Sequence, residues 1–146
     1  MVVRVAPGLP TLQCERTRLI QVFENLISNA IKYMGRPTGE IDVGCEDAGD
    51  CWKFHVRDNG PGIDAKYFEK IFQIFQTLAA RDERESTGIG LAIVKKTIEL
   101  SGGKVWVESK VFQENRVPFA RGKHSQLGIY TGQVSFIFSN IPMICR

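Results

Sequence analysis

Two stretches of the chain carry apolar residues at the three- and four-residue spacing of an amphipathic helix. The longer stretch, residues 19–34, is ended by the glycines and proline of GRPTG, and the shorter one, residues 89–100, is ended by two glycines. A third segment, YFEKIFQIF at residues 67–75, has a similar spacing over fewer turns. The pattern therefore predicts two good helices and one short helical stretch.

Other segments have the apolar and aromatic content that is typical of strands. They are VVRV near the N-terminus, EIDVGCE and CWKFHVRD as a hairpin, KVWVES after the second helix, and QVSFIFSNI near the end of the chain. Strands mostly in hairpin order, combined with these helices, predict a two-layer α/β (α+β) sandwich. Its sheet would be mixed and largely antiparallel.

The length of 146 residues suits one domain, residues 1–146, in which residues 110–131 have no clear period and form an irregular insertion. The net formal charge of +3 is too small to favour a nucleic-acid or anionic-membrane partner. No apolar run is long enough to span a bilayer and no signal peptide is visible, so we expect a cytoplasmic location. That setting disfavours a disulfide between Cys45 and Cys51, but the pattern leaves their pairing open.

One face of the longer helix carries polar residues that could form a metal and phosphate site. At 100° per residue, Asn25, Asn29 and Lys32 lie within an arc of about 60°. Amide oxygens can bind magnesium together with phosphate oxygens, and a lysine adds a positive charge toward phosphate. The alternative is an ordinary solvated face. Tyr33 borders this arc and suits either the edge of the core or a ring against a purine.

The segment RDNGPGID places an acid at the end of a predicted strand, followed by two glycines around a proline. Asp58 is a pure hydrogen-bond acceptor when ionised, which suits an exocyclic amine such as that of adenine. Gly60 and Gly62 would let the backbone approach a flat base closely. The alternative is a turn with a local side-chain hydrogen bond.

A third motif, TGIGLAIVKK at residues 87–96, puts two glycines before a helix. The free N–H groups of a helix N-terminus bind phosphate readily. The segment lacks the Walker A pattern, and no strand leads directly into it as in a Rossmann fingerprint.

Taken together and in this order, ENLISNAIKY, RDNGPGI, KIFQIFQ and TGIGLAIVKK resemble the N, G1, F and G2 boxes of sensor histidine kinases. RDEREST and GGKVWVES look especially like the phytochrome-type branch. The resemblance covers roughly residues 10 to 109 and the last strand. It implies the Bergerat ATP-binding fold, which is shared with gyrase-type ATPases and MutL.

The resemblance also implies roles for single residues. Asp58 would bind the adenine amine, Asn29 would be the magnesium ligand, and Lys32 would contact phosphate. Asn25 would line the same face, and Tyr33 would be the aromatic beside adenine. Asn25, Asn29 and Lys32 form the implied catalytic set.

The rest of the implied ATP site follows from the F and G2 boxes. Residues 76–87 would form a mobile lid between these boxes, with a hinge at the glycines under the phosphates. The full implied set of ATP-binding residues is Asn25, Asn29, Lys32, Tyr33, Asp58, Gly60, Gly62, Ile63, Phe72, Phe75, Thr87, Gly88, Ile89, Gly90 and Leu91.

The implied reaction moves the γ-phosphoryl group of ATP, with Mg²⁺, to a histidine on a dimerisation domain, and then to a response regulator. The chain has two histidines, His55 in a predicted strand and His124 in the irregular segment. Neither has the helical context of the family's acceptor. We therefore expect an excised catalytic domain that is monomeric alone.

Two other functions stay open at this stage. A hydrolytic gyrase-type ATPase would carry a glutamate base four residues before the metal-binding asparagine, where this chain has Asn25. The neighbouring Glu24 points about 140° away from Asn29 on the helical wheel. A module that binds ATP without chemistry is the third candidate.

Overall fold

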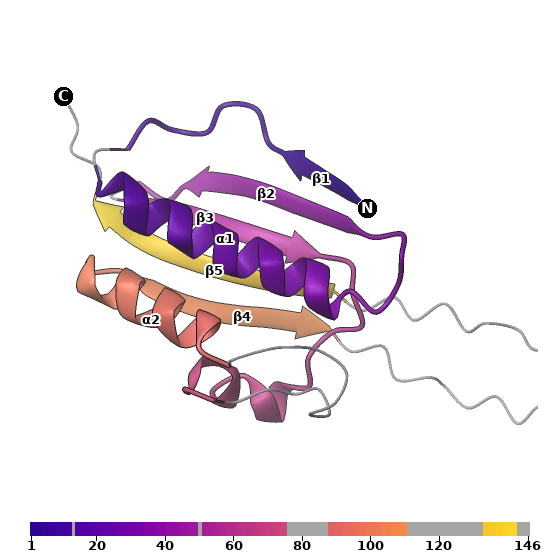
Figure 1. Cartoon of the computed structure of the whole chain (residues 1–146). Coiled ribbons are helices and arrows are strands. Elements are labelled where there is room, and N and C mark those ends of the chain that lie inside the picture. Colours follow the sequence, from indigo (N-terminus) through magenta and orange to yellow (C-terminus); the bar gives the residue numbers. More distant parts are fainter. Residues whose placement is uncertain (13, 50, 76–87, 111–132, 143–146) are drawn as a thin grey trace, which may run out of the picture.

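The computed structural model describes residues 1–12, 14–49, 51–75, 88–110 and 133–142. Its five strands form one sheet in the order β1-β2-β3-β5-β4 (Figure 1). β1 pairs in parallel with β2, and the other neighbours are antiparallel. The predicted mixed, largely antiparallel sheet is thus confirmed. The strands are β1 (Val2–Val5), β2 (Glu40–Asp47), β3 (Cys51–Asp58), β4 (Lys104–Lys110) and β5 (Gln133–Pro142).

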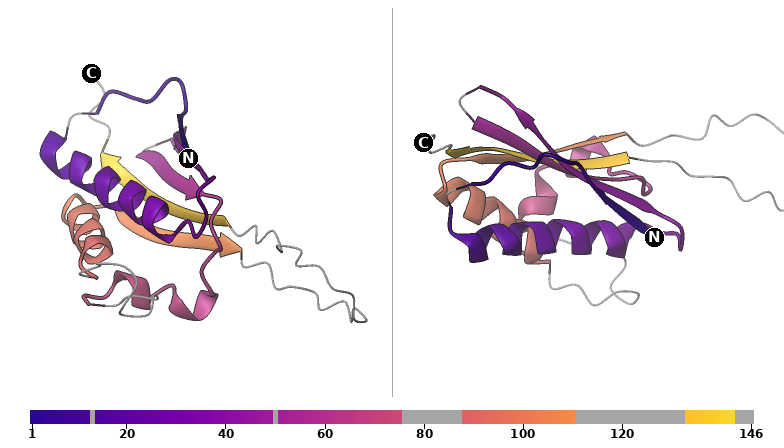
Figure 2. Two further views of the ribbon diagram at one scale, coloured as in Figure 1. Left: turned by 45° about the vertical axis from the view of Figure 1, so that its right-hand side comes forward. Right: turned by 90° about the horizontal axis from the view of Figure 1, so that it is seen from above.

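Two α-helices, α1 (Arg16–Tyr33) and α2 (Gly90–Leu100), pack side by side on one face of the sheet (Figure 2). Both lie where the apolar period predicted them, although α1 begins three residues earlier than that pattern. This arrangement is the predicted two-layer sandwich. Its core is the buried set Val22, Leu26, Ala30, Met34, Ile41, Val43, Phe54, Val56, Ile71, Val94, Ile98, Val107 and Phe136.

Buried and more exposed residues alternate along β3, and the buried ones form the face of the sheet that the helices cover. Phe54, Val56 and Asp58 are buried, whereas Arg57 between them is exposed. Phe54 packs edge-on against Phe23 of α1, with ring centroids 6.1 Å apart. A fully buried apolar side chain of this kind contributes roughly 1.5–3 kcal/mol. Asp58 is therefore the exception on a face that the core would otherwise fill.

The segment predicted as one short helix at residues 67–75 is instead a pair of 3₁₀ turns, η1 (Ala65–Tyr67) and η2 (Lys70–Phe72). Ile71 is buried, and Phe72 packs edge-on against Phe136 of β5 at 6.4 Å between centroids. Contacts with the sheet thus position this segment without a continuous helix.

β5 lies between β3 and β4, although it follows both in sequence. Val107 of β4 and Val56 of β3 pair with the same residue of β5, Phe136. The end of β3 and the end of β4 therefore lie near the same end of the sheet. The candidate site is built at that end.

Two further predictions concern the cysteines and the membrane. Cys45 lies opposite Phe54 in the β2–β3 hairpin rather than opposite Cys51, and both thiols are free. They do not pair. Within the described ranges, no helix is both long and apolar enough to cross a bilayer.

Candidate functional site

The polar face of α1 meets the beginning of α2. The Asn25 amide nitrogen donates to the Gln21 carbonyl at 2.8 Å, which holds the side chain along the helix. The Asn25 Oδ1 lies only 2.6 Å from where a Cβ on Gly90 would be. Gly90 therefore lets Asn25 approach the first turn of α2, where the backbone N–H groups have no side-chain cap.

Asn29 and Lys32 continue this face toward the end of α1. Both are half-buried. Within the part of the chain that the structure describes, no hydrogen bond engages the side-chain amide of Asn29. The Lys32 Nζ lies 5.9 Å from the centroid of the half-buried Tyr33 ring.

Asp58 ends β3 and is the acid of the site. It is only 6% exposed, and its Oδ1 accepts a hydrogen bond from the Gly60 N–H at 2.8 Å. Burial raises the pKa of Asp58 to about 6, against the opposing effects of this hydrogen bond and of the Arg36 charge. A buried acceptor with a shifted pKa is typical of a functional group.

Gly60 brings the Asp58 turn against the end of α1. A Cβ at this position would lie 2.7 Å from Asp58 Oδ1 and 3.6 Å from the Tyr33 carbonyl oxygen. The structure thus places Asp58 and Tyr33, which are 25 positions apart in the sequence, at one end of the helix layer.

Gly62 has a different reason to be glycine. Its φ is +86°, and a Cβ would lie 2.6 Å from the Lys110 carbonyl oxygen. The next residue, Ile63, donates its backbone N–H to Ser109 Oγ at 2.8 Å. The close approach at Gly62 is therefore to the end of β4, which fixes the loop that carries Gly60.

A backbone hydrogen bond joins the F-box segment to the G2 segment. Phe75 donates its N–H to the Gly88 carbonyl at 2.9 Å, with a φ of +64° and a side chain that is 75% exposed. Ile89 occupies the N-cap position of α2, and Leu91 packs against the core. Thr87 and the proposed lid at residues 76–87 lie outside the described residues.

Two residues that the motifs did not single out hold this site together. Asn59 exchanges hydrogen bonds with Glu40, through its N–H at 3.2 Å and its Oδ1 at 2.9 Å. Arg36 donates from Nη2 to the Asn59 carbonyl. The amide beside an acid at a strand end was a signal for Asn59, whereas nothing in the local pattern pointed to Arg36.

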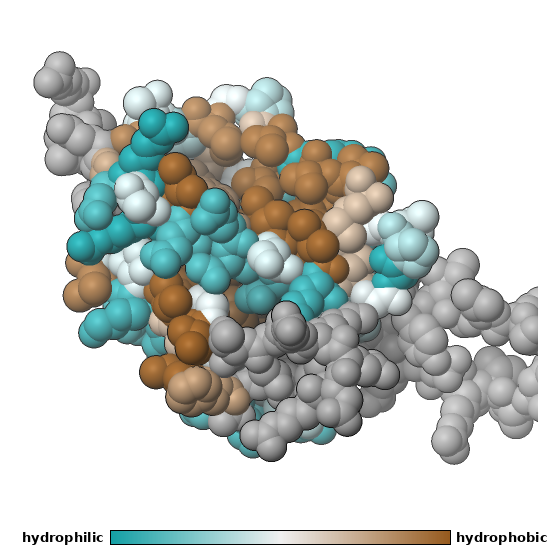
Figure 3. Space-filling view, in the orientation of Figure 1, coloured by the Kyte–Doolittle hydropathy of each residue, from teal (hydrophilic) through white to brown (hydrophobic). Residues whose placement is uncertain are grey.

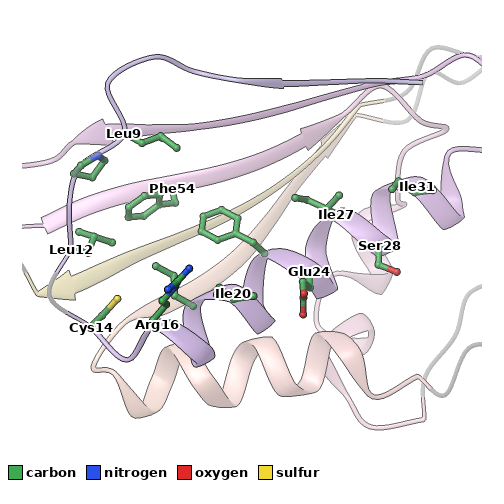
Figure 4. Close-up of a pocket in the computed structure, with 13 residues that line it drawn as sticks. Leu9, Leu12, Cys14, Arg16, Ile20, Glu24, Ile27, Ser28, Ile31 and Phe54 are labelled. Atoms are coloured by element: carbon green, nitrogen blue, oxygen red, sulfur yellow. The ribbon is translucent and has the colours of Figure 1, made fainter.

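A pocket of about 820 Å³ lies on the other side of α1, between this helix and the loop after β1 (Figure 4). Leu9, Ile20 and Ile31 contribute exposed apolar surface there, and hydrophobic residues gather over this part of the molecule (Figure 3). Glu24 lines this pocket, whereas Asn25, about 100° around α1, does not. The wheel-based prediction that Glu24 points away from the polar arc agrees with this placement.

Comparison with known proteins adds independent support. The family described as "Histidine kinase-, DNA gyrase B-, and HSP90-like ATPase" matches residues 14–129. Cyanobacterial phytochrome A of Nostoc sp. is 50% identical over 103 residues, which are 70% of this chain and 14% of that protein. Phytochrome-like protein Cph1 of Synechocystis sp. is 48% identical over 102 residues, with the same two shares. The chain is a histidine kinase catalytic domain.

Solved structures agree with this histidine kinase catalytic domain in fold. The catalytic domain of histidine kinase ThkA is 31% identical with a TM-score of 0.67, over 96% of this chain and 76% of that one. ThkA has also been crystallised with the response regulator protein TrrA, and this chain covers 32% of that ThkA chain at 30% identity and a TM-score of 0.62. Full-length ShkA, solved with AMPPNP, has a TM-score of 0.68 at 24% identity, which shows the fold alone.

The expected phytochrome-like branch is confirmed by these curated relatives. The chain spans about 14% of the length of each of the two phytochromes. The domain itself is therefore established, whereas the activity and partners of a longer protein are matters for proposal.

Proposed function

We propose that this domain binds ATP with Mg²⁺ and transfers the γ-phosphoryl group to a histidine on a separate dimerisation domain. The phosphoryl group then passes to an aspartate of a response regulator, and the parent protein works in the cytoplasm. The observation that carries the proposal is the placement of Asn25 against Gly90. This contact brings the polar face of α1 beside the uncapped N-terminus of α2, and helix N-termini are suited to binding phosphate.

Asp58 and Tyr33 form the end of the site that would hold the adenine base. An ionised Asp58 accepts a hydrogen bond from the exocyclic amine of adenine, and its burial strengthens that bond. Tyr33 supplies an aromatic ring at the end of α1. This pair favours adenine over bases that offer an oxygen at the same position.

The metal site fits a magnesium ion that is held mainly by the nucleotide. Across the described ranges, no group of three or more His, Cys, Asp and Glu side chains could hold a metal by itself. Asn29 offers one amide oxygen, which matches the preference of magnesium for a few protein oxygens plus phosphate and water. When bound, the ion would neutralise charge on the phosphates, and Lys32 would add to this effect.

The arrangement favours transfer over hydrolysis. Asn25 occupies the position of the hydrolytic base and cannot take a proton from water. Glu24, the acid that precedes Asn25 in sequence, lines the pocket on the other side of α1. His55 lies in β3 between Phe54 and Val56, on the face of the sheet away from the helices, and His124 lies outside the described residues. The acceptor histidine would therefore come from outside this domain.

The test mixes the chain with γ-labelled ATP and Mg²⁺, with and without a dimeric helical hairpin that carries the parent's histidine. We expect phosphohistidine on the hairpin and little free phosphate without it. Asn29→Ala should abolish transfer, whereas the matched change Ser28→Ala on the exposed neighbour should not. Rapid release of phosphate by the isolated chain would favour the gyrase-type reading. ATP binding with no transfer to the hairpin would favour a non-catalytic module.

A further inference from the structure

Arg36 links the segment between α1 and β2 to the end of β3, 23 positions further along the chain. It follows α1 beyond Gly35, whose φ of +70° turns the chain back toward the sheet. Its Nη2 donates to the backbone carbonyl of Asn59, directly after Asp58. Asn59 is in turn bonded to Glu40 at the beginning of β2. One guanidinium thus fixes the strand end that presents the base-binding acid.

The hydrogen bonding of Arg36 is incomplete. Its Nε is buried and has no hydrogen-bond partner among the residues that the structure describes. Buried donors are nearly always paired in native proteins, because an unpaired donor loses its bonds to water without replacement. An arginine kept only for stability would not be expected to leave this donor unpaired.

The charge of Arg36 acts on Asp58. Asp58 is 6% exposed, and its carboxylate accepts a hydrogen bond from the Gly60 N–H. Among the described residues, Arg36 is the charged group that acts on it, and it favours the ionised carboxylate against the effect of burial. Arg57 is the neighbouring arginine in sequence, but it is exposed and bonds Ser135 Oγ at 3.2 Å.

We propose that Arg36 is a positioning residue for base recognition, which fixes the Asp58–Gly60 turn through Asn59 and keeps the Asp58 carboxylate in its charged form. The proposal rests on the proposed ATP site. A charged carboxylate accepts from the amine of adenine and repels the oxygen that a 6-oxopurine places there. A protonated carboxyl can donate to that oxygen. Arg36 would therefore set the preference for ATP over ITP through Asp58.

The experiment measures the dissociation constants of ATP and ITP by calorimetry at several pH values between about 5 and 8.5. The proteins are the wild type, Arg36→Gln, Arg36→Lys and the control Arg57→Gln. Removal of the charge should weaken ATP binding about tenfold near pH 7 and reduce the ATP-to-ITP preference by a similar factor. As the pH falls, protonation of Asp58 should weaken ATP binding, and we call this part of the pH profile the acid limb. Removal of the Arg36 charge should move the acid limb to higher pH.

The other variants separate charge from packing. Arg36→Lys keeps the charge and loses the planar fork, so it should keep the wild-type acid limb while ATP binding weakens several-fold. Arg57→Gln should match the wild type in both respects. This pattern would support the proposal even if Arg36→Gln folded poorly.

Two results would overturn the idea. Wild-type base preference and an unmoved acid limb in Arg36→Gln would leave this arginine a merely structural role, whatever happened to the melting temperature. A wild-type chain that binds no adenine nucleotide would instead refute the proposed function, and base recognition by Arg36 with it.

Discussion

Asp58→Asn should make the domain more stable and a worse ATP binder at the same time. The substitution removes the negative charge but keeps the shape and the oxygen that accepts from the Gly60 N–H. The folded-state pKa of Asp58, about 6, lies above the ordinary value of 3.8 because the carboxyl is buried. The folded protein therefore holds this proton more tightly than the unfolded chain does.

The sign of the stability effect follows directly. Above about pH 6 the ionised Asp58 lowers the free energy of unfolding, and this penalty disappears as the pH falls below about 4. The difference in pKa corresponds to roughly 3 kcal/mol at its maximum. Because Arg36 loses its neighbouring charge in the variant, we expect a net gain of about 1–3 kcal/mol at pH 8 and almost none at pH 4.

The effect on ATP has the opposite sign. A hydrogen bond to a charged group contributes about 1.5–3 kcal/mol, so the dissociation constant should rise by about 10- to 150-fold. Denaturant unfolding of both proteins at pH 4 and pH 8, with calorimetric titration of ATP, measures both quantities. An equal loss of stability at the two pH values would contradict the burial penalty on the Asp58 charge, and unchanged ATP affinity would contradict its contact with adenine.

Further predictions concern the glycines. Gly62→Ala should destabilise the fold by about 2–4 kcal/mol, because its positive φ and the Lys110 carbonyl oxygen both oppose a Cβ. The matched control Gly49→Ala has a similar φ but open space around it, so about 1–2 kcal/mol is expected, and equal losses in denaturant unfolding would contradict the packing argument. Gly90→Ala should change stability by less than about 1 kcal/mol, yet weaken ATP binding about tenfold by displacing Asn25. In an Asn25→Ala background the same change should cost little further affinity, and an additive loss would show that the two residues act separately.

The fold was largely predictable because its elements have strong periods. The apolar spacing located α1 and α2, and the alternation of CWKFHVRD located β3 and its buried face. The position of β5 between β3 and β4 was not predictable in this way, since strand order depends on pairing between distant segments. The two 3₁₀ turns at residues 65–72 were missed for a similar reason, because contacts with β5 help to place them.

The geometry of the candidate site was predictable where the helical period fixes side chains on one face. Asn25 and Asn29 share the polar side of α1 because four residues make about one turn. Arg36 could not be assigned, since its partner Asn59 is 23 positions away and the intervening hairpin sets their distance. The contact of Ser109 with Ile63 spans 46 positions and was equally hidden.

A map of backbone amide chemical shifts during titration with ATP and Mg²⁺ would show directly where the nucleotide binds. The largest changes should fall at Gly60, Asn29 and Gly90, which lie after β3, on the polar face of α1 and at the beginning of α2. The amides of Leu9 and Ile20, beside the apolar pocket on the other side of α1, should change little. Changes concentrated at that pocket, with Gly60 and Gly90 unaffected, would contradict nucleotide binding between α1, the end of β3 and α2.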